Sequence, residues 1–199
     1  METFDQRLQR FKNNSPIEFI ETILNAMYSG KVGSRLWELE VAAQNQLSDL
    51  LILGIHACIE TISENIFLKK GIEGFKFYLE NFVDTNKEGF RFSEIADELN
   101  DWRNIVAHQY ISRLGHSFGY NYSILTGYQV ENGTIIINPK IFFDQFRRAF
   151  INENVVINGN ASLVTGGKTK RKIWDYQEII ANDKIKEAKT KFLEKFENR

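Results

Sequence analysis

The sequence has few of the residues that build disulfide frameworks, cysteine-based metal centres or broken helices. Cys58 is the only cysteine, which excludes an intrachain disulfide and a zinc site built on cysteines. Pro16 and Pro139 are the only prolines in 199 residues, so few positions prevent the backbone from continuing a helix. The longest apolar run, Leu50–Ile55, is far shorter than the roughly 20 residues of a membrane-spanning helix. We therefore expect a helical protein without disulfides and without a membrane partner.

The overall composition is that of a soluble globular protein, with 43% hydrophobic and 26% charged residues. The length suits a single domain over residues 1–199. Residues 168–199 carry ten Lys or Arg against six Asp or Glu, and the preceding residues carry 15 against 20. A basic tail on an acidic body is compatible with a nucleic-acid partner, although a solvated helix face is the commoner explanation. The N-terminus shows no secretory pattern, so we expect a cytoplasmic protein.

Apolar residues recur at helical spacing along most of the chain. The pattern predicts helices over residues 3–12, 16–27, 34–69, 75–83, 94–113, 139–150 and 175–197. Ser15 before Pro16, and Asn138 before Pro139, are typical of an N-cap followed by proline at the first helical position. Over residues 50–59 the long segment is apolar on nearly all sides, which predicts the centre of a bundle. Gly54 costs that helix roughly 1 kcal/mol of propensity, and a close approach between helices would be a reason to keep it.

The pattern changes to β-strand after the helix predicted over 94–113. Two β-rich runs, 122–130 and 134–137, flank Asn132-Gly133, which is a strong hairpin signal. A second such pattern occupies 155–164. We expect a mainly α fold: an up-and-down bundle of four or five helices with a small β-hairpin insertion after the 94–113 helix. Its core helices would occupy about 1–115 and 139–151, with the hairpin at 122–137 and a basic loop and C-terminal helix at 165–199.

Polar side chains suited to catalysis gather on the helix predicted over 94–113. At about 100° per residue, Asn104 and His108 share one face, and Arg103 and Tyr110 share the neighbouring stripe. Small Ala107 leaves room for a phosphate or a partner backbone to approach. A separate apolar stripe suited to burial consists of Ile95, Leu99, Trp102 and Val106. One side of this helix is therefore built to face a core, and the adjacent side collects polar groups.

The string Arg103-Asn104-x-x-Ala107-His108-x-Tyr110 resembles the signature of the HEPN superfamily, all-α proteins many of which are metal-independent ribonucleases. More narrowly, Arg103, His108 and Tyr110 match the Arg-x4-His-x-Tyr form of HEPN toxins that are paired with a minimal nucleotidyltransferase antitoxin. The likeness covers about ten residues and the helical pattern before them. It does not extend to the last third of the chain.

The resemblance implies a homodimer in which two copies of the motif helix face each other across a cleft that takes RNA. It assigns Arg103 to the charge on the phosphate, His108 to acid–base catalysis, and Asn104 to the imidazole or the phosphate. Tyr110 would be the residue to which the antitoxin enzyme adds nucleotide. A half-buried core tyrosine with its hydroxyl at the edge is an equally good explanation of Tyr110.

An arginine and a histidine placed in this way can cleave RNA without a metal ion or any other cofactor. The reaction needs a base for the 2′-hydroxyl proton, an acid for the leaving oxygen, and a cation for the charge that develops at phosphorus. Histidine moves protons near neutral pH, and the arginine fork matches phosphate oxygens. The expected product carries a 2′,3′-cyclic phosphate end.

His56 and Glu60 lie four residues apart on the segment 34–69 and are candidates for lining the same cleft. Burial with mutual hydrogen bonding is the other explanation for the pair. Two such groups do not make a metal site without further ligands, and we expect no metal.

Three interpretations of the chain stay open. The first is a HEPN-type endoribonuclease that serves as the toxin or effector of a prokaryotic toxin–antitoxin or phage-defence system. The second is a non-catalytic HEPN module that binds nucleotide or RNA or scaffolds a partner protein. The third is a structural helical interaction protein, in which Arg103 pairs with Glu98, Asp101 or a neighbouring helix within one subunit.

Overall fold

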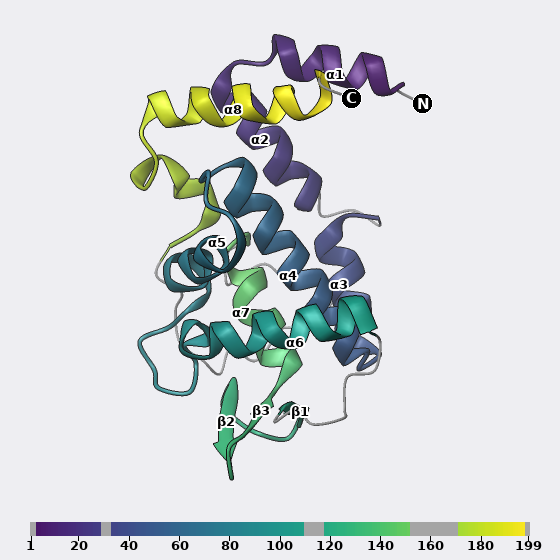
Figure 1. The fold of residues 1–199 in the computed structure, drawn as a ribbon, viewed down its shortest axis with the longest axis vertical. Helices are drawn as coiled ribbons and strands as arrows, with labels where there is room; N and C mark the ends of the chain where they lie inside the picture. The colour runs from purple at the N-terminus through teal and green to yellow at the C-terminus, as the bar shows by residue number, and fades with distance from the viewer. Residues whose placement is uncertain (1–2, 29–32, 110–117, 152–170, 198–199) are drawn as a thin grey trace.

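The computed structural model is mainly helical with a small three-stranded sheet, and it describes residues 3–28, 33–109, 118–151 and 171–197 (Figure 1). Side chains are described for the same ranges except those of residues 108, 109 and 197. The mainly α character predicted from the apolar spacing is confirmed. No helix in these ranges has the length and apolar character that a bilayer crossing requires.

The first two helices begin where their capping residues predict. α1 (Phe4–Asn13) starts at Thr3, and α2 (Pro16–Met27) starts at Ser15 with proline at its first turn. Both N-caps form a capping box, in which the Thr or Ser side chain and the Gln or Glu three residues later satisfy each other's backbone N–H groups. The sequence prediction of both helices is therefore confirmed.

The prediction of a single long helix over 34–69 is wrong, because the chain forms two helices there, α3 (Arg35–Gln44) and α4 (Ser48–Asn65). Gln46 at the break adopts a left-handed conformation with φ of 52°. The side-chain Nδ2 of Asn45 donates to the Val41 carbonyl at 2.8 Å, and Leu47 N–H donates to the Ala42 carbonyl at 2.9 Å. These bonds satisfy the carbonyls at the end of α3 and turn the chain, so that α3 packs against α4.

Gly54 lies where these two helices meet. A Cβ at this position would sit 2.5 Å from Cδ2 of Leu39. The close helix–helix approach offered as the reason for this glycine is therefore what the structure contains.

The helix that carries the motif string begins differently from the prediction. α5 (Gly71–Tyr78) continues as a π-helical turn, η1 (Leu79–Val83), and a 3-10 turn, η2 (Phe92–Ile95), leads into α6 (Ala96–Gln109). Ser93 lies inside η2, and its backbone N–H and hydroxyl both donate to the buried carboxylate of Asp84. The part of the expected helix beyond Gln109 lies outside the described residues.

The sheet contains the predicted hairpin and one strand that the sequence did not indicate. β2 (Tyr128–Glu131) and β3 (Thr134–Ile137) pair antiparallel around Asn132 and Gly133, whose φ angles of 51° and 76° suit a tight turn. The first strand starts at Tyr128, later than the expected residue 122. β1 (Phe118–Tyr120) pairs in parallel with the other edge of β3.

After the sheet, α7 (Pro139–Arg148) begins at Asn138, whose side chain accepts from the N–H groups of Lys140 and Ile141 as predicted. The prediction of a single helix over 175–197 is wrong. This segment forms a 3-10 turn, η3 (Ile173–Glu178), followed by α8 (Asn182–Glu197). The second hairpin expected over 155–164 and the basic loop up to residue 170 lie outside the described residues.

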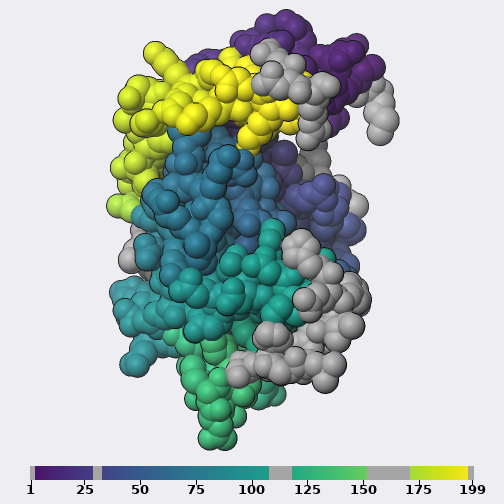
Figure 2. Space-filling model, viewed as in Figure 1, coloured from purple at the N-terminus to yellow at the C-terminus, as the bar shows by residue number. Residues whose placement is uncertain are grey.

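α4 occupies the centre of the molecule and contacts α3, α5, α6, α7 and α8. Its apolar side chains are completely covered at Leu51, Ile55, Ile59 and Ile62. α1 and α8 lie side by side across one end, and the β2–β3 hairpin projects at the other (Figures 1 and 2). The two terminal helices are joined to α2 by packed rings from Phe11, Phe19, Phe192 and Phe196. The packed centre of the fold, through α4 and α5, therefore supports α6.

Candidate functional site

The apolar stripe of α6 holds the helix against the core and leaves its polar side at the surface. Ile95 in η2 and Leu99, Trp102 and Val106 in α6 are all buried, as the spacing predicted. Arg103 and Asn104 are half-buried, and Ala107 is exposed. Because α6 packs against both α4 and α5, the polar side of the helix borders those elements.

Arg103 is held by hydrogen bonds at both of its terminal nitrogens. Nη2 donates to Oε2 of Glu60 in α4 at 2.8 Å, and Nη1 donates to Oδ1 of Asn104 at 2.8 Å. The Arg103 and Glu60 side chains keep 29% and 28% of their surface exposed. The guanidinium is therefore fixed by an ion pair from a neighbouring helix and still open to solvent.

His56 lies one helical turn before Glu60, but it is buried. Its ring stacks on Phe75 with centroids 4.1 Å apart, and only 1% of the residue is exposed. Nδ1 is 3.6 Å from Oε2 of Glu60. No hydrogen bond of normal geometry reaches either imidazole nitrogen from the described residues.

Burial lowers the pKa of His56 to about 4, with a further decrease from the charge of Arg103. The nearby side chain of Asn100 opposes part of this decrease in pKa. His56 is therefore neutral near pH 7 and closed to solvent, which suits packing beneath the Arg103–Glu60 pair and does not suit proton exchange with a substrate.

The structure thus brings together four of the six residues singled out from the sequence: His56, Glu60, Arg103 and Asn104. We call these four residues the Arg103 cluster. The backbone of His108 belongs to the last turn of α6. The side chain of His108 and the whole of Tyr110 lie outside the described residues.

Two further residues belong to the surroundings of the cluster and were missed by the sequence argument. Asn100 lies one turn before Asn104 on α6, so helical spacing alone could have identified it. Phe75 comes from α5, and no local pattern links it to His56. Its contact depends on the packing of α5 against α4.

The neighbouring surface of α6 is acidic. Asp97, Glu98 and Asp101 are exposed, and Asp97 pairs with Lys76 of α5 at 2.6 Å. In the described ranges, no three His, Cys, Asp or Glu side chains converge closely enough to hold a metal ion. Arg103 is therefore the cation that the described part of the cluster offers to an anionic ligand.

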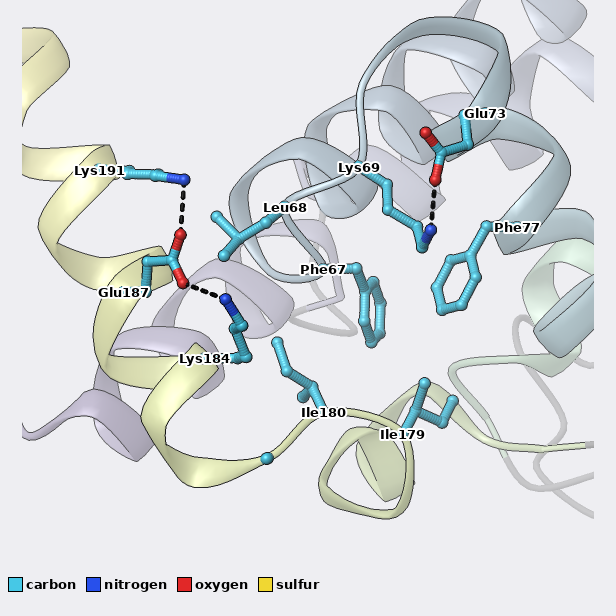
Figure 3. Close-up of a pocket in the computed structure, with 11 residues that line it drawn as sticks. Phe67, Leu68, Lys69, Glu73, Phe77, Ile179, Ile180, Lys184, Glu187 and Lys191 are labelled. Carbon is cyan, nitrogen blue, oxygen red and sulfur yellow. Dashed lines mark hydrogen bonds and ion pairs between the residues drawn. The ribbon is translucent and has the colours of Figure 1, made fainter.

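A hollow of about 550 Å³ lies elsewhere, where the chain leaves α4, between α5 and the start of α8 (Figure 3). Its base is apolar, with Phe67, Phe77, Ile179 and Ile180. The lysines around it already bind carboxylates: Lys69 pairs with Glu73, and Lys184 and Lys191 share Glu187. No residue of α6 lines this hollow, so it is separate from the Arg103 cluster.

Comparison of the chain with protein-family models, with curated proteins and with solved structures gave no match. The motif string and the geometry of the Arg103 cluster are therefore the features of this chain that bear on its function.

Proposed function

We propose that this protein is a HEPN-type, metal-independent endoribonuclease that acts as a homodimer. The observation that carries the proposal is the string from Arg103 to His108 on one helix, with the arginine oriented and open to solvent. In this proposal α3, α4, α6 and α7 belong to the up-and-down bundle, and the hairpin is an insertion after the motif helix. The protein works in the cytoplasm as the toxin or effector of a toxin–antitoxin or phage-defence system, and a nucleotidyltransferase-like antitoxin acts on Tyr110.

The proposed reaction is a transesterification within the RNA strand. His108 of one protomer takes the proton from a 2′-hydroxyl, and the 2′-oxygen attacks the adjacent phosphorus. Arg103 stabilises the negative charge that builds on the non-bridging oxygens. The bond between phosphorus and the 5′-oxygen breaks, and His108 of the second protomer protonates that oxygen. The products are a 2′,3′-cyclic phosphate and a 5′-hydroxyl.

The decisive measurement is cleavage of an end-labelled structured RNA in the presence of EDTA. We expect cleavage by the wild type, a loss of about 10²–10⁴-fold for His108→Ala, and a loss of about 10²-fold or more for Arg103→Ala. Arg91→Ala is the matched control, because Arg91 is an exposed arginine that pairs with Glu94 outside the cluster. Circular dichroism and sedimentation establish that each variant folds and dimerises. No wild-type cleavage of several RNAs, or equal cleavage by all four proteins, contradicts the ribonuclease.

A second candidate function is a non-catalytic HEPN module. The Arg103–Glu60 ion pair favours a non-catalytic protein, because the guanidinium already has a carboxylate partner within one protomer, and the same pairing is expected of a structural helical protein. Such a module binds RNA or nucleotide without cleaving it, and His108→Ala leaves that binding intact. In a purely structural protein, Arg103→Ala lowers stability and no RNA binding is measurable for the wild type.

A further inference from the structure

The hydrogen bonds of Arg103 leave part of its guanidinium unused. Arginine has five N–H donors in a fixed plane. Glu60 and Asn104 take one each, and they are the hydrogen-bond partners of Arg103 within the described residues. The remaining donors belong to a group whose side chain is 29% exposed. An incoming phosphate therefore meets a guanidinium whose rotation is restricted at both terminal nitrogens.

The same contacts cancel the charge of the site. Glu60 places a carboxylate 2.8 Å from Arg103, and His56 beneath the pair contributes no positive charge at neutral pH. Exposed Asp101 lies two residues before Arg103 on the same helix. A phosphate that approaches Arg103 must therefore compete with a carboxylate that already occupies Nη2.

We propose that Glu60 is a positioning residue for Arg103, which fixes the guanidinium for the transition state and weakens the binding of ground-state RNA. This inference rests on the proposed ribonuclease function. The carboxylate costs affinity because it repels and competes with phosphate. It increases the rate because a fixed guanidinium needs no reorientation when charge develops at phosphorus. Glu60 itself touches neither the substrate nor the reacting atoms.

The test separates affinity from rate with Glu60→Gln and Glu60→Ala. RNA affinity is measured by fluorescence anisotropy of a labelled single-stranded RNA, with each Glu60 variant combined with the non-cleaving His108→Ala substitution. The values of kcat and KM are measured for the Glu60 variants that retain His108. Glutamine keeps an oxygen that accepts from Nη2 but removes the charge, whereas alanine removes both. We expect RNA to bind about threefold more tightly to both variants, since an exposed charge pair has an effect of this order.

The values of kcat should distinguish the two variants, although their RNA affinities rise by the same amount. We expect kcat to fall about tenfold for Glu60→Ala, while Glu60→Gln retains most of the wild-type kcat. KM should fall in both variants. A purely structural role would lower stability without this fall in KM beside the fall in kcat, and the conservative glutamine would then bring no partial recovery.

Glu64→Gln is the matched control, because Glu64 lies one turn further along α4 and pairs with Lys195 at 2.8 Å and Lys70 at 3.6 Å away from Arg103. It should change neither RNA affinity nor kcat. RNA affinity that is unchanged or weaker in both Glu60 variants overturns the positioning role, even if the wild type cleaves RNA. Tighter binding by the Glu60 variants together with no cleavage by the wild type overturns the ribonuclease and shows that Glu60 controls phosphate access to Arg103.

Discussion

A buried, neutral histidine next to an ion pair is the least usual feature at the residue scale. His56 stacks on Phe75, borders Glu60, and lacks a hydrogen bond of normal geometry from the described residues. Desolvation makes the imidazolium form unfavourable in this place, and the charge of Arg103 adds to the penalty. The folded protein therefore keeps His56 neutral over a pH range in which the unfolded chain protonates it.

This difference predicts a loss of stability in mild acid. The pKa of His56 falls from an ordinary 6.5 to about 4 on folding, so the unfolded state binds the proton first as the pH drops. The stability contributed by neutral His56 is present above pH 6.5 and is lost progressively towards pH 4. We expect the free energy of unfolding to be about 2 kcal/mol lower at pH 5 than at pH 7.5 from this group alone.

Urea unfolding at the two pH values, for the wild type and His56→Phe, measures the effect. Phenylalanine retains the stacking on Phe75 and does not titrate. The variant should therefore lose about 2 kcal/mol less than the wild type between pH 7.5 and pH 5. An identical pH dependence for both proteins would show that folding does not lower the pKa of His56.

At the element scale, the connection between α4 and α5 is held by its backbone conformation and by the hydrogen bonds of Ser63. Leu68 and Gly71 both have positive φ, at 57° and 54°. The carbonyl of Ser63 accepts a hydrogen bond from the N–H of Lys69, and the Ser63 hydroxyl donates to the carbonyl of Gly74 at 2.9 Å. These bonds fold α5 back onto α4, which brings Phe75 against His56. The geometry beneath the Arg103 cluster therefore depends on this turn.

Gly54 in α4 and Gly74 in α5 should respond differently to alanine. A Cβ at Gly74 would lie 2.5 Å from the carbonyl oxygen of Lys69, which is backbone and cannot rotate away. A Cβ at Gly54 would meet only the end of the Leu39 side chain, which another rotamer can move. We expect Gly74→Ala to lower the free energy of unfolding by about 2–3 kcal/mol. Gly54→Ala should stay within about 1 kcal/mol of the wild type, because alanine gains helix propensity.

Urea unfolding of both variants at pH 7.5 is the measurement. Equal losses for the two substitutions would contradict the distinction between a backbone obstacle and a side-chain obstacle. Gly74→Ala should also reduce RNA cleavage at temperatures where the variant is folded, because the turn supports the base of the cluster.

At the scale of the whole molecule, the buried centre and the exposed side of α6 are the features on which the proposed function depends. α4 is covered on most sides, and the terminal helices are fastened by rings such as Phe11 and Phe192. Ala107 is exposed on α6, next to the half-buried Arg103. In the proposed homodimer this surface faces the same surface of a second protomer, so two arginines and two histidines share one cleft.

Ala107→Gln should therefore weaken the dimer without unfolding the protomer. A longer side chain at a close helix–helix contact costs about 1–3 kcal/mol, so we expect the dimer dissociation constant to rise about tenfold or more. Analytical ultracentrifugation over a concentration series measures it, with Glu98→Gln as an exposed control on the same helix. A dimer that is equally stable in both variants would place the interface away from Ala107.

Much of the fold could be predicted because its signals are local. The start of α2 follows from Ser15 and Pro16, and the β2–β3 hairpin follows from Asn132-Gly133. Cys58 lies in an apolar stretch of the sequence and is buried, and burial raises the pKa of its thiol to about 12. The break at Gln46 was missed because the apolar pattern continues on both sides of it. β1 was missed because a three-residue strand has too short a pattern to recognise.

By itself, the sequence determined where α1, α2 and α7 begin, which side of the motif helix is buried, and that Arg103 and Asn104 lie on its polar side. Only the tertiary structure decided that Arg103 meets Glu60, because the two are 43 residues apart and their contact depends on how α6 packs on α4. It also decided that His56 is buried while Glu60, one turn later, is partly exposed. Helical spacing gives the face of a residue on its own helix, and the neighbouring elements determine which part of that face water can reach.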